Sequence, residues 1–225
     1  MDNKNQNTHL YIVAAVFIIV GAVFLFRSLK DKALVEDEGF TDFNELSYTE
    51  LEDGMLVEGE FIEAYDPFAE TYETRYGIRF SDDSEQLYYV VPAGNEEEYE
   101  TLEYRYIGFL CGQTWFDRMD DLIDETDEYY SDEFATDPVP VSFTAKVRDM
   151  TDEEIGWMEE YFISSGISED EMDYYMHPVV LEVYSKEGYK AGLWVGFGAV
   201  AIGGVILVIA LVLRAKKKKE EDVYY

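Results

Sequence analysis

The run AGLWVGFGAVAIGGVILVIALVL, from Ala191 to Leu213, contains no charged side chain. As a helix it would rise about 1.5 Å per residue and span roughly 35 Å, which exceeds the hydrocarbon core of a bilayer at about 30 Å. The sequence RAKKKK, the densest cluster of positive charge in the chain, follows at once. This order predicts a transmembrane helix whose C-terminal end is held at a membrane surface.

A second apolar run, LYIVAAVFIIVGAVFLF, lies between Leu10 and Phe26. Its helical span of roughly 26 Å is short for a bilayer, but Tyr11 and Arg27 can anchor its two ends. A cleaved signal peptide is the alternative. Such a peptide has a shorter apolar region and a small-x-small cleavage site, which the following FLFRSLKDK does not offer. We therefore expect an uncleaved anchor.

These two runs predict how the chain is divided. The expected segments are a cytoplasmic N-terminus (1–9), a transmembrane helix (10–26), a tether (27–42), an acidic extracytoplasmic domain (43–186), a second transmembrane helix (191–213) and a cytoplasmic basic tail (214–225).

Charge is distributed unevenly along the chain. The 225 residues include 49 Asp and Glu against 17 Lys and Arg, for a formal net charge of −32. Between Ala33 and Lys190 there are 44 acidic and 8 basic residues. A surface this acidic repels nucleic acid and anionic membranes, unless the arginines gather in one place. The arginines in question are Arg75, Arg79, Arg105 and Arg118.

Basic residues next to a membrane helix remain in the cytoplasm, so they indicate the orientation of the chain. The tail residues that determine it are Arg214, Lys216, Lys217, Lys218 and Lys219. Arg27, Lys30 and Lys32 favour the opposite orientation. The tail has more weight, because a large loop crosses a membrane largely regardless of its charge. We expect a multi-pass protein of the cell membrane with both termini in the cytoplasm.

Small residues recur along one side of each predicted helix, and such positions let two helices approach closely. The second run has Gly192, Gly196, Ala199 and Gly203 at spacings of four, three and four, and the first has Ala14 and Gly21 seven apart. The plain prediction is a hairpin of the two helices within one chain. A homodimer contact through the glycine-rich second helix is the alternative.

The central segment alternates β-forming and helical patterns, which predicts an α+β domain. Expected strands are Met55–Tyr65 (with a bulge or bend at Gly59), Tyr72–Phe80, Leu87–Pro92, Tyr104–Leu110, Val139–Val147 and Val179–Ser185. Expected helices are Thr114–Tyr130, Thr151–Gly166 and Ser168–Pro178, the last two opening with capping boxes. The SDDS sequence, residues 81–84, is expected to form a turn. This order suggests a small antiparallel β-barrel, compatible with the five-stranded oligonucleotide/oligosaccharide-binding barrel.

Residue types that carry chemistry are few. Cys111 is the one cysteine, so no intrachain disulfide can form, and it could act as a nucleophile only if His177 lies beside it. We expect a buried, inert cysteine. The acidic runs Asp120–Glu133 and Asn95–Glu100 could bind Ca²⁺, but neither has the spacing of a calcium loop, and solvated helix faces explain them. No catalytic residue, cofactor or metal site is predicted.

Paired tyrosines at 88–89, 129–130 and 174–175 allow two interpretations. They could stack on sugars or on a partner surface, or they could form part of the barrel wall, which we favour. The lipid bilayer and another protein are the expected partners.

Three stretches carry a resemblance to a known group of proteins: YTELEDGMLVEGEFIEAY (48–65), YYVVP (88–92) and YRYIGFL (104–110). Together with the two apolar runs, they resemble uncharacterised two-pass membrane proteins of Gram-positive, clostridia-like bacteria. The resemblance implies a membrane location and one extracytoplasmic domain, and it carries no catalytic signature. We expect a membrane protein that presents its acidic domain as a non-enzymatic interaction, sensing or assembly module.

Overall fold

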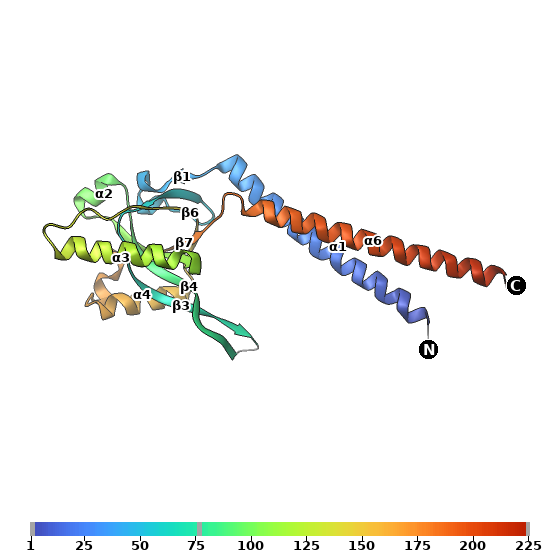
Figure 1. Cartoon of the computed structure of the whole chain (residues 1–225). Coiled ribbons are helices and arrows are strands. Elements are labelled where there is room, and N and C mark those ends of the chain that lie inside the picture. Colours follow the sequence, from blue (N-terminus) through green and yellow to red (C-terminus); the bar gives the residue numbers. More distant parts are fainter. Residues whose placement is uncertain (1–2, 76–77, 224–225) are drawn as a thin grey trace. The chain divides into compact units, whose positions relative to one another are not determined.

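The computed structural model describes residues 3–75 and 78–223. The chain forms two compact units (Figure 1). One unit is Gly39–Ser185, and the other combines the residues before Gly39 with those after Ser185.

Two long helices make up the discontinuous unit. Helix α1 runs over Asn3–Ala33 and continues into a π-helical turn, η1, at Leu34–Glu38, while α6 runs over Gly188–Val223. Both apolar runs are therefore helical, as predicted. Helix α1 continues through residues 27–33, which were predicted to begin a tether, because no glycine or proline lies between Arg27 and Gly39. Gly39 adopts a φ of 73°, which favours glycine.

Seven strands form one open mixed sheet in the Gly39–Ser185 unit, in the order β1-β2-β6-β7-β5-β4-β3. The pairs β1/β2 and β5/β7 are parallel, and the other pairs are antiparallel. The strands are β1 (Thr41–Asp42), β2 (Leu56–Phe61), β3 (Tyr65–Arg75), β4 (Ile78–Ala93), β5 (Arg105–Gly112), β6 (Val141–Asp149) and β7 (Met176–Val183).

The predicted barrel is wrong. Strands β1 and β3 lie at opposite edges of the sheet and do not pair with each other, so the sheet does not close. The order of the strands also differs from that of the predicted barrel, because β2 pairs with β6, far away in sequence, and not with β3. The SDDS sequence, which was expected to turn, lies within β4, since β3 ends at Arg75 and β4 begins at Ile78.

Helices cover both faces of the sheet (Figure 1). Helix α3 (Phe116–Ser131) packs on one face through Met119, Leu122 and Ile123, and α4 (Asp152–Ser164) packs on the other through Met158 and Phe162. Short helices α2 (Glu96–Thr101) and α5 (Met172–Tyr175) complete the unit. The side chains along each strand therefore alternate between the α3 side and the α4 side of the sheet, because successive side chains point to opposite faces.

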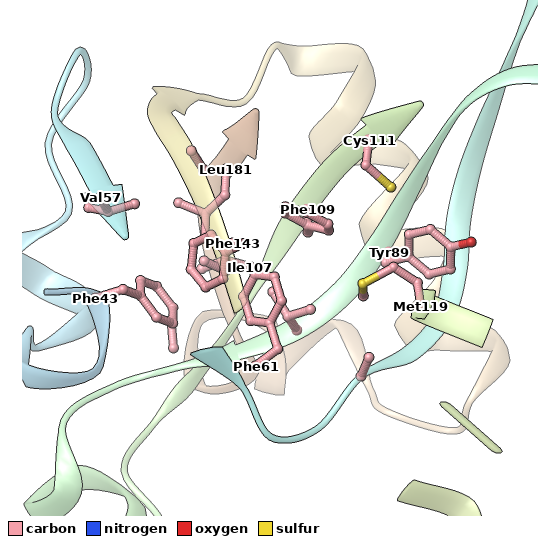
Figure 2. Packing of buried hydrophobic residues seen from close by; sticks show 14 of the residues in the cluster. Phe43, Val57, Phe61, Tyr89, Ile107, Phe109, Cys111, Met119, Phe143 and Leu181 are labelled. Atoms are coloured by element: carbon pink, nitrogen blue, oxygen red, sulfur yellow. The ribbon is translucent and has the colours of Figure 1, made fainter. Parts of the chain in front are cut away.

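Phenylalanine dominates the core on the α3 side (Figure 2). The rings of Phe61 and Phe143 stack with centroids 3.9 Å apart, and Phe109 meets Phe61 edge-on at 4.8 Å. Phe43 is the fourth member of the cluster, with its ring centroid 5.2 Å from that of Phe143. Aromatic pairs in these geometries add about 1 kcal/mol each beyond their burial, so this cluster is a main source of stability.

Local signals at helix ends were reliable. The capping boxes Thr151/Glu154 and Ser168/Glu171 are both present, and Gly166, with a φ of 93°, follows the end of α4. The predicted third helix is wrong in its extent. Ser168 opens a 3₁₀ turn, η5 (Glu169–Glu171), and then α5, after which β7 begins at Met176 and includes Pro178.

Gly59 forms no bulge, because β2 pairs with β6 in continuous register through it. Its missing side chain makes room for the 3₁₀ turn η2 (Phe43–Glu45): a Cβ at position 59 would lie 2.5 Å from Asn44 Oδ1 and 2.9 Å from Phe43 Cβ. The Asn44 amide donates to the Glu60 carbonyl and accepts from the Glu60 N–H, both at 2.9 Å. The Asn44 side chain thus satisfies the backbone hydrogen-bonding groups of Glu60 on the edge of β2, beyond the end of β1.

Candidate functional site

Helices α1 and α6 pack against each other along the small residues of each. A Cβ added to Gly196 would come within 2.7 Å of Leu25, and one added to Gly203 would come within 2.7 Å of Ile18 and 2.9 Å of the Ala14 carbonyl oxygen. These distances are too short for any larger side chain. The backbones therefore approach as closely as small residues permit.

Other members of the predicted stripe lie at or near the same contact. Gly21 is buried against Gly196 and Val200, and Gly192 lies against Ser28. Ala14 and Ala210 are buried, and Ala199 is half-buried.

The two apolar runs overlap along their length. The helices are antiparallel, since Ser28 meets Gly192 while Ala14 meets Gly203. Ile18, the middle residue of the first run, contacts Gly203, next to the middle of the second run. Two spans that cross one flat bilayer need this alignment, because their apolar parts must occupy the same depth.

The outward sides of both helices are apolar and uncovered within the unit. Ten large apolar side chains of α1 and ten of α6 are exposed: Ile12, Val13, Val16, Phe17, Ile19, Val20, Val23, Phe24, Phe26 and Leu29, and Trp194, Val195, Phe197, Ile202, Val205, Val208, Ile209, Leu211, Val212 and Leu213. Both helices are long and apolar enough to cross a membrane. Soluble proteins rarely expose contiguous apolar surface on this scale.

Charged residues flank the apolar part of each helix. Arg27 and Lys30 are exposed on α1, and Lys32 forms an ion pair with Glu36 at 3.5 Å. On α6, Arg214 and Lys216 are exposed beyond the apolar run. The side chains of Lys217, Lys218 and Lys219 lie outside the described residues.

Cys111 and His177 are not brought together. Cys111 lies near the C-terminal end of β5, whereas His177 lies near the start of β7. These strands are parallel, with Tyr106 opposite Met176 and Gly108 opposite Val180, so the two residues are about 15 Å apart along the sheet. Cys111 is 1% exposed within the phenylalanine core, on the side of Tyr89 and Met119 (Figure 2).

The chemistry of each side chain agrees with this separation. Burial and the charge of Asp120 raise the pKa of the Cys111 thiol to about 12, so the thiolate is not formed at neutral pH. His177 packs edge-on against Tyr48, with ring centroids 5.5 Å apart, and burial lowers its pKa. The geometry gives no nucleophile and base pair.

The acidic runs form helical surfaces. Asp120, Asp121 and Asp124 are exposed on α3, and Glu96 and Glu97 are exposed on α2, a helix that the sequence did not predict. The Asn95/Glu98 capping box was the overlooked signal for α2. Among the side chains that the structure describes, no three His, Cys, Asp or Glu residues lie close enough together to hold a metal ion.

The arginines do not gather into a basic patch in the part of the chain that the structure describes. Arg105 lies between the rings of Tyr48 and Tyr174, at 4.9 and 4.5 Å, and Arg118 lies over Trp115 at 5.7 Å. The side chains of Arg75 and Arg79 lie outside the described residues.

The three tyrosine pairs have different environments. Tyr88 and Tyr89 are buried on opposite faces of the open sheet, so they are part of a strand but not of the predicted barrel wall. Tyr129, Tyr130 and Tyr174 are exposed. The Glu63 carboxylate accepts hydrogen bonds from Tyr130 at 2.7 Å and from Tyr65 at 3.1 Å. Burial raises the pKa of Tyr65, while partial desolvation of the hydroxyl and its hydrogen bond to Glu63 raise the pKa of Tyr130, so both remain donors at neutral pH.

A family model described as a domain of unknown function, DUF8577, matches residues 4–214. The chain belongs to the DUF8577 family. The matched span includes the apolar runs of α1 and α6 as well as the whole sheet, so the helix pair is part of what defines DUF8577. The four lysines of the tail follow the matched span. No curated protein and no solved structure matches the chain.

Proposed function

We propose that this chain is a two-pass integral membrane protein. Helices α1 and α6 cross the bilayer as a hairpin, and the Gly39–Ser185 unit acts outside the cytoplasm as a non-enzymatic interaction, sensing or assembly module. The observation that carries the proposal is the pair of aligned apolar runs, whose outward sides no part of their own unit covers.

Energetics support a bilayer as the surroundings of the helix pair. Twenty large apolar side chains are exposed on the two helices. Transfer of each from water to hydrocarbon is worth roughly 1.5–3 kcal/mol when complete, so even half of that effect totals on the order of 20 kcal/mol. A domain is stable by only about 5–15 kcal/mol. In water, therefore, this surface would drive aggregation.

Charge supports the orientation with both termini in the cytoplasm. The Gly39–Ser185 unit contains 40 Asp and Glu against 6 Lys and Arg, a formal net charge of −34. A membrane potential that is negative inside favours such a domain outside, by about 2.3 kcal/mol per charge per 100 mV. The lysines at 216–219 favour the same orientation.

An interaction role, and not catalysis, agrees with the geometry of the domain. Cys111 and His177 lie at different ends of the sheet, and the acidic side chains of α3 point into solvent. The partners proposed are the bilayer and another protein. A homodimer through Gly192, Gly196 and Gly203 would have to displace α1, which occupies these positions.

Membrane integration is tested by washing native membranes with carbonate at high pH and then with high salt. We expect the chain to remain in the pellet, while a peripheral protein is released. Release of the chain by either wash would overturn the proposal of spanning helices.

Orientation is tested by labelling single cysteines in intact cells with an impermeant maleimide. Glu97→Cys places a thiol on the exposed face of α2, and Asp222→Cys places one in the tail. The wild-type chain is the matched control, because buried Cys111 should not react. We expect labelling at position 97 alone. Labelling at position 222 alone would show the opposite orientation, and the assignment of spanning helices would stand.

A further inference from the structure

We propose that the C-terminal end of α3 and the loop after it form the docking surface for a cationic segment of a partner protein that also carries apolar side chains. This inference rests on the interaction role proposed above. It names the surface involved and the chemistry of the partner.

Exposed large apolar side chains in the Gly39–Ser185 unit are concentrated at this place. Phe134 is 90% exposed, Val139 66% and Tyr130 61%, and Tyr129 and Ile62 are also exposed. Single exposed apolar residues are ordinary on a soluble domain. A group of five is different, because aromatic residues at the centre of an interface carry much of its binding energy.

A ring contact and hydrogen bonds link most of these residues to the C-terminal end of α3. The rings of Tyr129 and Tyr130 lie 5.3 Å apart, and Tyr130 donates to Glu63, the neighbour of Ile62 in sequence. The loop after α3 is tied back to the helix, since the Val139 N–H donates to Glu125 Oε2 at 2.6 Å, one helical turn before Tyr129. The Phe134 N–H donates to Asp132 Oδ1 at 3.0 Å.

Charge identifies the partner. From Met119 to Ala145 the chain has nine Asp and Glu and no Lys or Arg. Carboxylates at Asp127, Glu128, Asp132, Glu133 and Asp137 are exposed around the apolar group. A rim of negative charge attracts a positively charged partner and repels acidic partners, while the apolar centre supplies affinity. The occupant is therefore basic and apolar, not a lipid surface, which presents anionic head groups.

The test uses the full chain in nanodiscs of phosphatidylcholine, a lipid without net charge. Two fluorescent peptides serve as probes, one of alternating lysine and tryptophan and one of alternating lysine and glycine. Both experience the same long-range attraction, so their difference reports the apolar surface. We expect the tryptophan peptide to bind at least about ten-fold more tightly by anisotropy, since two lost hot-spot contacts exceed 1.4 kcal/mol.

The test variant is Phe134→Ser combined with Val139→Ser, and the matched control is Ile163→Ser. Ile163 is also exposed, but it lies on α4, on the other face of the sheet. We expect the double variant to lose the ten-fold preference and the control to retain it, with unchanged urea midpoints in both.

Three results would overturn the proposal. The first is a wild-type chain that binds both peptides equally, and the second is a double variant that keeps the preference. The third is self-association of the chain that the double variant abolishes, which would assign the surface to a second copy. Failure of the chain to enter nanodiscs would count against the membrane proposal and not against this surface.

Discussion

Arg148 holds the buried carboxylate of Glu154 with two parallel hydrogen bonds, from Nη1 to Oε2 at 2.8 Å and from Nη2 to Oε1 at 2.6 Å. Glu154 also accepts from the Thr151 N–H at 2.8 Å, which makes it both a member of the capping box of α4 and the link from that helix to β6. Burial by itself would raise the pKa of Glu154, but these donors hold it at about 2.

Glu154→Gln should therefore destabilise the domain by about 3 kcal/mol, because it leaves a partly buried guanidinium with only the more distant and more exposed carboxylate of Glu182, at 3.8 Å, as its counter-charge. The matched control is Glu153→Gln, an exposed neighbour in the same turn. Urea unfolding of the full chain in detergent, followed by near-ultraviolet circular dichroism, measures the difference. Equal midpoints for the two variants would contradict this role for the ion pair.

The same carboxylate predicts a pH dependence. The pKa of Glu154 is lowered from 4.5 to about 2 on folding, so its contribution is complete above about pH 4.5 and is lost as the pH falls towards 2. The difference in unfolding free energy between wild type and Glu154→Gln should shrink across this window. A difference that stays constant from about pH 5 to 2 would refute the assignment.

Gly196→Ile should weaken the helix pair, since its Cβ would meet Leu25 at 2.7 Å. Gly198 is the matched control on the same helix, because a Cβ there has no neighbour within 4 Å. Overpacking costs about 1–3 kcal/mol, which corresponds to a fall of about 5 °C in melting temperature for a chain of this size. Thermal unfolding in detergent checks this, and a similar loss for Gly198→Ile would show that bulk alone is responsible.

Asn44→Ala should cost about 2 kcal/mol, because it leaves the N–H and carbonyl of Glu60 without their protein partner at the sheet edge. Glu45→Ala, an exposed neighbour, is the control. Gly59→Ala should cost less in the Asn44→Ala background than in wild type, because one of its two clashes is gone. Strict additivity in a double-mutant cycle by urea unfolding would contradict the proposed contact.

Cys111 should resist alkylation in the folded chain. Its thiol is buried and has a pKa of about 12, so the iodoacetamide rate should remain low up to about pH 9, while the added thiol of Glu97→Cys reacts faster as the pH rises. Mass spectrometry with and without denaturant measures both sites. Native labelling at the denatured rate would show that Cys111 is accessible.

Features that depend on neighbours in sequence could be predicted from the sequence. The two apolar runs predicted the helices α1 and α6. The spacing of Met119, Leu122 and Ile123 indicated which side of α3 is buried. The Thr151/Glu154 box gave the start of α4. In each case the deciding interaction spans a few residues, so the local pattern contains it.

Features that depend on distant pairing could not be predicted in this way. Nothing near β2 indicates that its partner is β6, and β7 lies between β6 and β5 in the sheet although α4 separates it from β6 in sequence. Gly59 looked like a bulge because its true neighbour, Asn44, is remote in sequence. Val139 fits the alternation of β6 but lies outside that strand, since Glu125 holds its backbone beside α3.

The glycine face of α6 is already in use within the chain. Any further polypeptide that approached α6 from outside the pair would meet mainly branched and aromatic side chains, with Gly198 and Gly204 as the open exceptions. If the pair spans a bilayer as proposed, lateral association through α6 should therefore be loose and exchangeable, because acyl chains fit the same side chains equally well.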